Sequence, residues 1–204
     1  MELEELLKFL DDDNFLNQVE GHKIPNINLY MDQVLTFMNE NLECYKRNQD
    51  DKILTKSMIN NYVKSNMIPK PENKKYYPQH IIAIIYIFYL KQILSLDDAK
   101  IVLKNYLDSH FNLEEMSSLY NVFLAAEKCE EEKIESELKE LSNSLFDNFK
   151  EDYKDDEILF LFIMLLASRA NTYKVIIERL LDGRDKESSL HTKKHIKKNK
   201  DTIK

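Results

Sequence analysis

The chain has 204 residues, of which 43% are hydrophobic and 32% are charged, and its formal net charge is −7. This balance is typical of a globular protein and excludes general disorder. Only two glycines and four prolines occur, which disfavours nucleotide-binding α/β folds, with their tight turns and glycine-rich phosphate loops, and favours helices.

The first helices are predicted from apolar residues at helical spacing. A short amphipathic helix is expected within residues 1–10. Asn28 is expected to cap a second helix, whose apolar stripe runs from Met31 to Leu42. The polar segment 46–51 then predicts a loop.

The next segment predicts a short third helix with two different faces. Thr55 is expected to be its N-cap, with Ile59 and Tyr62 on an apolar face. Lysine and asparagine recur every four positions on another face, which is free to contact a partner. Asn66 is expected to close the helix in the left-handed conformation, and Pro69 prevents it from resuming.

The sequence KPENKKYYP at residues 70–78 predicts a small extended hairpin or wing. Six lysines stand between Lys52 and Tyr77 against one internal acid, Glu72. The negative charge of the whole chain argues against general binding of polyanions, so this local basic stretch is informative. Of Tyr76 and Tyr77, one is expected to pack in the core and the other to lie on the surface.

Two apolar runs in the remaining chain predict core helices. Residues 79–94 are apolar nearly all round and predict a buried central helix, after which Ser95 and Asp98 resemble a capping box that opens the next helix. Residues 113–149 predict a long amphipathic helix or a helical pair, and a last helix is expected to end at Gly183. Its run 158–167, like the run 81–90, is about half the roughly 20 residues that span a membrane, so both are interpreted as buried.

The third helix and the wing together have the composition of a DNA reader. Lysines and hydroxyl groups hold phosphates, while asparagine pairs bidentately with adenine in the major groove. The segment LTKSMINNYVKSNMIPKPENKKYYPQH, preceded by IPNINLYMDQV and followed by LKQILSLDD, resembles the bacterial domain-of-unknown-function family 1836 over about residues 24–106. It is also similar to the MerR-type winged helix-turn-helix.

The MerR-type resemblance implies roles for individual residues. Tyr62 would occupy a tyrosine of the recognition helix and Asn66 its helix-stopping glycine, while Lys75 would stand for the wing arginine and Tyr77 for its closing tyrosine. Two features depart from that pattern. Asn60 stands where MerR-type proteins have a phosphate-binding arginine, and the loop 46–53 is longer than their usual turn.

No enzyme is expected from the sequence. The five histidines and two cysteines show no metal-ligand spacing, except that His191 and His195 could meet on one helical turn of a very polar tail. Neither Cys44 nor Cys129 has a neighbouring histidine to activate it. Without a signal-peptide pattern, free thiols and a cytoplasmic location are expected, with no metal and no cofactor.

The sequence therefore predicts an all-α protein with a small β wing. Residues 1–110 are expected to be a winged helix-turn-helix domain, 111–183 a helical dimerisation or effector region, and 184–204 a basic, disordered tail. The protein is expected to be a cytoplasmic transcriptional regulator that binds double-stranded DNA as a homodimer. It is expected not to bind a membrane, and an unknown small molecule or protein is expected to act as its effector. The predicted DNA-binding residues are Lys52, Thr55, Lys56, Ser57, Asn60, Asn61, Tyr62, Lys64, Lys74, Lys75, Tyr76 and Tyr77.

Three other interpretations stay open at this stage. Lysine is common throughout the chain, so the basic face could be merely solvated. A protein-interaction module with winged architecture would use Tyr76, Tyr77 and the helical second half against a partner protein. A weaker alternative has the apolar helices and the basic tail associating with a membrane.

Overall fold

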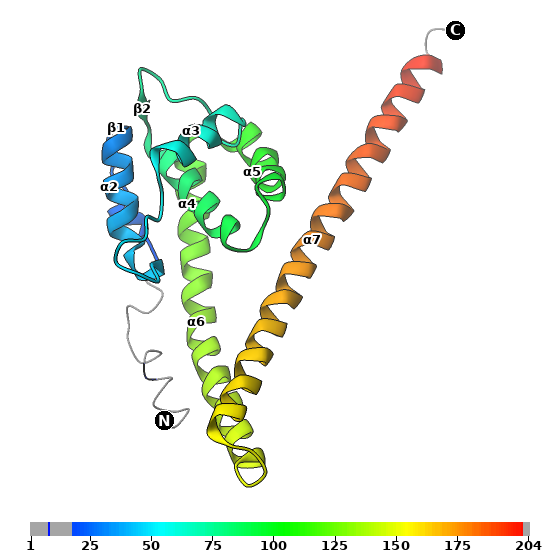
Figure 1. Cartoon of the computed structure of the whole chain (residues 1–204). Helices are drawn as coiled ribbons and strands as arrows, with labels where there is room; N and C mark the ends of the chain where they lie inside the picture. Colours follow the sequence, from blue (N-terminus) through cyan, green and yellow to red (C-terminus); the bar gives the residue numbers. More distant parts are fainter. Residues whose placement is uncertain (1–7, 9–17, 202–204) are drawn as a thin grey trace.

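The protein is mostly helical with one small two-stranded sheet, as its composition predicts (Figure 1). The computed structural model describes residues 8 and 18–201, apart from the side chains of Glu132 and of 184–201. The helix expected within residues 1–10 therefore lies outside the described residues, apart from residue 8. The elements are η2 Gly21–Lys23, β1 Leu29–Tyr30, α2 Met31–Asn41, η3 Glu43–Tyr45, α3 Lys56–Lys64, β2 Lys75–Tyr76, α4 Pro78–Ile93, α5 Leu96–His110, α6 Leu113–Phe149 and α7 Asp155–Asp201.

The strands β1 and β2 pair antiparallel, with Leu29 opposite Tyr76 and Tyr30 opposite Lys75. Each strand is followed by a helix. Strand β1 leads directly into α2, and β2 is separated from α4 by one residue, Tyr77. The prediction that Asn28 caps the second helix is wrong, because residues 29–30 are taken up by the strand pair and α2 begins only at Met31. An extended hairpin or wing was predicted within residues 70–78 from local residues, whereas the pairing of β2 with the distant strand β1 was not predicted.

The core of the N-terminal unit surrounds α4, whose side chains are buried on nearly every side, as predicted. This unit, which we call the head, comprises residues 18–124. Its core includes Met116 and Tyr120 of α6, and the Tyr120 hydroxyl donates a hydrogen bond to the carbonyl of Val19. The packing of the head therefore continues past residue 110, where the sequence placed its end.

The rest of α6 and all of α7 form an extended arm (Figure 1). The two helices pack through a second small core, in which Ile158 and Phe162 of α7 contact Leu145 of α6. Beyond that core they diverge, and α7 also contacts α5. Residues 113–149 are thus one long helix, which was one of the two predicted alternatives.

Two predictions for α7 are wrong. The helix does not end at Gly183 but continues to Asp201, because a single glycine costs a helix only about 1 kcal/mol relative to alanine. It therefore includes most of residues 184–204, predicted to be a disordered tail. The run 158–167 is largely exposed rather than buried. Among the described helices, the Asp155–Gly183 part of α7 alone is long and apolar enough to cross a membrane, judged by length and composition only.

His80, in the first turn of α4, joins the wing to the core. It is buried, its Nδ1 accepts a hydrogen bond from the backbone N–H of Tyr77 at 3.1 Å, and its ring meets Phe111 edge to face. Burial disfavours the charged imidazolium and lowers the pKa of His80 to about 4. At α2, Gln33 accepts the backbone N–H of Tyr30 in the same way, at 2.9 Å.

The lowered pKa of His80 predicts a loss of stability in weak acid. As the pH falls from about 6.5 to about 4, the unfolded chain binds a proton at His80 that the folded chain does not, so the free energy of unfolding falls by on the order of 2–3 kcal/mol. His80→Gln keeps the acceptor for Tyr77, as Gln33 does in α2, and should lack this component. Urea unfolding between pH 7 and pH 4.5 checks it, and parallel curves for the two proteins would contradict it.

Candidate nucleic-acid interface

Helix α3 has the two faces that its sequence predicts. Thr55 caps it, since its Oγ1 accepts the backbone N–H of Met58 at 3.3 Å, and Ile59 and Tyr62 are buried. Asn66, just after the helix, has a φ of 56°, which confirms the predicted left-handed stop. The opposite face is exposed and consists of the polar residues Lys56, Ser57, Asn60, Asn61 and Lys64. Met58, at the border of the two faces, is also exposed, by 38%.

The polar groups on this exposed face are not used within the fold. None of the five side chains forms a hydrogen bond or an ion pair with another described residue. Polar side chains on a helix often bond to the backbone carbonyl four residues earlier, as Asn39 and Asn41 do in α2. The face of α3 therefore offers ammonium, amide and hydroxyl groups that are available to an external partner.

The wing ends in a tight turn at residues 72–75, where Lys75 N donates to the carbonyl of Glu72 at 2.8 Å. Both central residues have positive φ, 48° at Asn73 and 62° at Lys74. This is the conformation of a type I′ turn, in which the second central position usually holds glycine. A lysine there costs about 1 kcal/mol or more. The turn thus keeps an exposed lysine at its tip despite an unfavourable backbone conformation.

Side chains at the base of the turn hold its single acid. The Tyr77 hydroxyl donates to Glu72 Oε2 at 2.7 Å, and the Tyr77 ring stacks on His80. This hydrogen bond favours the protonated phenol and raises the pKa of Tyr77. Since Glu72 is bound to Tyr77, the carboxylate is engaged inside the wing rather than with a lysine.

Lys75 and Tyr30 form a contact that the sequence did not reveal. The Lys75 Nζ lies 5.3 Å from the centre of the Tyr30 ring, a cation–π contact across the two paired strands. Lys75 is half-buried and Tyr30 is exposed. The aromatic ring therefore orients the one wing lysine that comes from β2.

Not every predicted contact residue lies on this surface. Tyr62 and Tyr76 are buried in the core of the head, where burial raises the pKa of each hydroxyl, so their prediction as DNA-binding residues is wrong. Their aromatic rings supply apolar area that the small head needs. Tyr77 is half-exposed, which confirms that one tyrosine of the pair is buried and the other is at the surface. Thr55 is half-buried and engaged as the cap, while Lys52 is exposed in the preceding loop.

The basic residues of this surface carry unpaired charge. Six lysines lie between residues 52 and 75, and Lys75 contacts Tyr30. The others form no ion pair with any residue in the part of the chain that the structure describes, and they are Lys52, Lys56, Lys64, Lys70 and Lys74. They lie on α3, on the loop before it and on the loop and turn after it.

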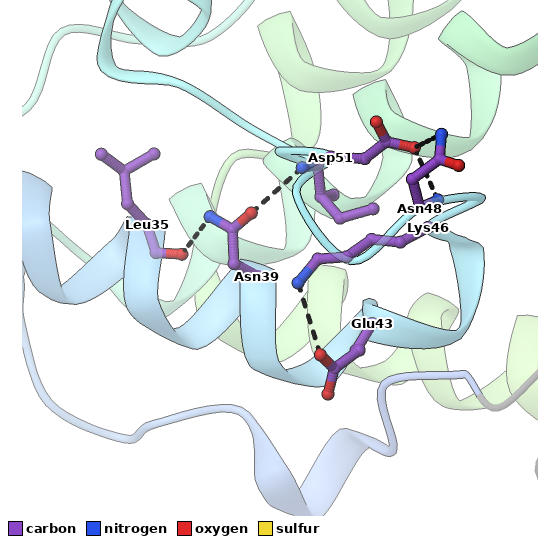
Figure 2. A network of polar contacts seen from close by, with 7 residues as sticks. Leu35, Asn39, Glu43, Lys46, Asn48 and Asp51 are labelled. Carbon is purple, nitrogen blue, oxygen red and sulfur yellow. Dashed lines mark hydrogen bonds and ion pairs between the residues drawn. The ribbon is translucent and has the colours of Figure 1, made fainter.

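Asn39 of α2 positions α3 by holding the loop that leads to it. Its Nδ2 donates to the Leu35 carbonyl at 2.7 Å and to the Leu54 carbonyl at 3.4 Å, while its Oδ1 accepts from Ile53 N at 3.0 Å. Figure 2 shows this amide between its own helix and the returning chain. The long loop is thereby fixed just before the Thr55 cap.

The loop itself is closed by a second set of contacts. The Asp51 carboxylate accepts from both the backbone N–H and the side-chain amide of Asn48, at 2.9 and 3.2 Å (Figure 2). Lys46 reaches Glu43 at 3.5 Å. Since Asp51 bonds to Asn48, the acid nearest to α3 is held inside the loop.

The described histidine, cysteine and acidic side chains do not gather into a cluster. Among the described side chains, no group of three or more His, Cys, Asp or Glu residues is placed to hold a metal ion. Cys44 and Cys129 are exposed and not joined in a disulfide. The groups that the surface exposes are ammonium, amide and hydroxyl groups.

Comparison with known proteins gives one match. A family model described as "Domain of unknown function (DUF1836)" matches residues 19–123, which is nearly the whole head. No curated protein and no solved structure matches the chain.

The Asn39 contacts predict that this residue supports the surface from beneath. Asn39→Ala leaves the N–H of Ile53 without its acceptor and should lower the free energy of unfolding by about 1–3 kcal/mol. Asn41→Ala is the matched control, because Asn41 also donates to the carbonyl one turn back, at 2.9 Å, but forms no hydrogen bond with the described residues of the loop. Urea unfolding of both variants measures the difference, and equal losses would contradict the role of Asn39.

Proposed function

The chain belongs to the domain-of-unknown-function family DUF1836, and we propose that it is a DNA-binding transcriptional regulator with a MerR-like winged helix-turn-helix. In this proposal α2 and α3 form the helix-turn-helix, α3 enters the major groove, and the 72–75 turn is the tip of the wing. The protein acts in the cytoplasm, as a homodimer and without catalysis.

The observation that carries the proposal is the unused polar face of α3. Asn60 and Asn61 present amides of the kind that pair with adenine edges, while Lys56 and Lys64 flank them with charges suited to phosphates. A merely solvated face would explain the lysines. It does not explain why a lysine occupies the strained tip of the neighbouring turn, since strained residues cluster at functional sites.

The wing complements the helix. Lys74 at the tip and Lys75 at the strand would contact phosphates beside the groove that α3 enters. The resemblance to MerR-type proteins supports the same order of helix, stop and wing. Because one such helix reads few bases, pairing of two copies through α6 and α7 doubles the contacted site. The same helices are where an unidentified small-molecule or protein effector would act.

A protein-interaction module is the second candidate function. Ile27 and Tyr30 are large, exposed and next to the wing, and exposed apolar residues are typical of protein interfaces. Such a module would bind a partner protein with little dependence on salt. Isolation of the protein with one protein partner and no DNA would favour it.

Binding to mixed-sequence duplex DNA at several salt concentrations tests the proposal. Roughly four to six phosphate contacts per subunit predict a log–log slope of about −4 to −5 for each subunit bound. The slope can be measured by fluorescence anisotropy. Absence of binding at low salt, or a slope near zero, would refute the proposed function.

The strained turn predicts opposite changes in stability and in DNA affinity. Lys74→Gly relieves the positive φ and should raise the free energy of unfolding by about 0.5 kcal/mol. It removes one phosphate contact, so DNA affinity should fall and the salt slope should shrink by about 1. Asn73→Gly is the control, because it changes the same turn and keeps the lysine, and its DNA affinity should stay unchanged. Equal DNA affinities for the two variants would show that the wing does not contact DNA.

A further inference from the structure

The last part of α7 has a charge opposite to that of the helices that lead to it. Residues 125–183, the rest of the arm, contain fifteen acids and eight lysine or arginine residues, a net charge of −7. Residues 184–201, which we call the basic end of α7, contain three acids and seven lysine or arginine residues, a net charge of +4. The same helix runs through both parts. The general lysine content of the chain does not explain this reversal, because the preceding part is acidic.

The cations of the basic end occupy two faces of the helix. Positions that are seven, four and three residues apart share a face. Lysine stands at four positions spaced in this way, which are Lys186, Lys193, Lys197 and Lys200. Arg184 and Lys198 belong to a second face, about 150° around the helix from the first. The basic end is therefore a rod with positive charge on nearly opposite sides.

The basic end lacks the apolar stripe that packing against a protein or a lipid surface requires. Its two apolar residues, Leu190 and Ile196, lie about 120° apart around the helix. They form no continuous stripe, in contrast to the apolar run 158–167 earlier in α7. The segment therefore matches a partner that presents negative charge on two sides better than it matches an apolar groove or a bilayer.

The lysines of the basic end repel one another unless an anion lies beside them. Lys193 and Lys197 are four residues apart, a spacing at which like charges destabilise a helix. Lys194 and Lys198 repeat this arrangement. No acid stands three or four residues from Lys193 or Lys194, and Asp201 is the one acid placed in this way for the other two. A row of phosphates would neutralise these charges, so binding of a polyanion would stabilise this part of the helix.

The basic end projects from the molecule. Helix α7 packs on α6 through Ile158 and Phe162 and also contacts α5, and Figure 1 shows its last turns extending away from the head. Residues 184–201 of the helix are about 27 Å long, which is the axial length of roughly eight base pairs of duplex DNA. The basic end is thus long enough to follow a phosphate backbone over most of one turn of the duplex.

We propose that the basic end of α7 is a second DNA-binding element, which holds the phosphates of double-stranded DNA without reading its sequence. The inference rests on the proposed function, because the surface of α3 is what makes duplex DNA, among polyanions, the expected partner. Lysines on nearly opposite faces of one helix suit a groove that has phosphates on both sides. The contacts of the basic end come in addition to those counted for the head.

DNA binding by the full chain at several salt concentrations tests this element. Lys193→Gln/Lys197→Gln removes two cations from one face of the basic end. It should weaken binding to mixed-sequence duplex DNA about tenfold at 0.1 M salt and shrink the log–log slope by about 2. Glutamine and lysine have similar helix propensities, so circular dichroism should give the helix content of wild type.

A matched variant controls for the change in net charge. Lys128→Gln/Lys133→Gln removes the same charge from exposed positions of α6, where Lys133 pairs with Glu130 at 2.6 Å. It should change the affinity by about twofold at most and the slope by less than about 0.5. Equal effects of the two double variants would overturn the inference, because net charge alone would then explain the loss.

A variant of α3 separates this inference from the proposed function. Lys56→Gln/Lys64→Gln removes two cations from the exposed face of α3. A loss of affinity in this variant, with none in Lys193→Gln/Lys197→Gln, would refute the basic end as a DNA-binding element and leave the proposed function standing. The opposite pattern would confirm the basic end and refute the role of α3.

Lipid is the other polyanionic partner, and vesicles test it. Phosphatidylcholine–phosphatidylglycerol vesicles should not bind the wild type at 0.15 M salt, because the basic end has no apolar stripe to insert. Flotation of the wild type that is abolished in Lys193→Gln/Lys197→Gln, with DNA affinity unchanged in that variant, would overturn the inference in favour of a membrane.

Discussion

The pairing of β1 with β2 is the constraint on which the head depends. Only two residues of each strand take part, yet they bring the start of α2 beside the start of α4 and close a loop that contains α2, α3 and the turn. Both helices then begin in the same way, with a tyrosine N–H bonded to a side chain three residues later, Gln33 in α2 and His80 in α4. Through this pairing β2 is held against α2 and α4.

Much of the fold followed from signals that act over a few residues. The Thr55 cap, the stop at Asn66 and the Ser95 cap are all present, because each depends on hydrogen bonds or backbone angles within one turn. The predicted capping box is incomplete, because Asp98 accepts the hydroxyl of Ser95 and not its backbone N–H. The start of α2 was missed because it depends on a strand more than 40 residues away. The exposure of α7 was missed because an apolar run shows a need for burial but not what supplies it.

The candidate site was predictable to the extent that it is periodic. The spacing of lysine and asparagine placed the polar face of α3 correctly, whereas the family resemblance assigned Tyr62 to the interface although it lies in the core. Asn39 has no sequence signal, because a polar residue on a helix does not reveal that it will hold a loop 14 residues later. The strain at Lys74 is equally invisible, since lysine is not the residue expected at positive φ.

The head and the arm divide recognition from association in this account. Its central claim is that the exposed face of α3 contacts DNA in the cell, and photo-crosslinking tests this most directly. Position 60, in the middle of that face, is replaced by a photo-reactive phenylalanine analogue, and position 122, an exposed site on α6, serves as the comparison. The account predicts a covalent protein–DNA product from position 60 and none from position 122. Crosslinks from neither position, or equally from both, would contradict it.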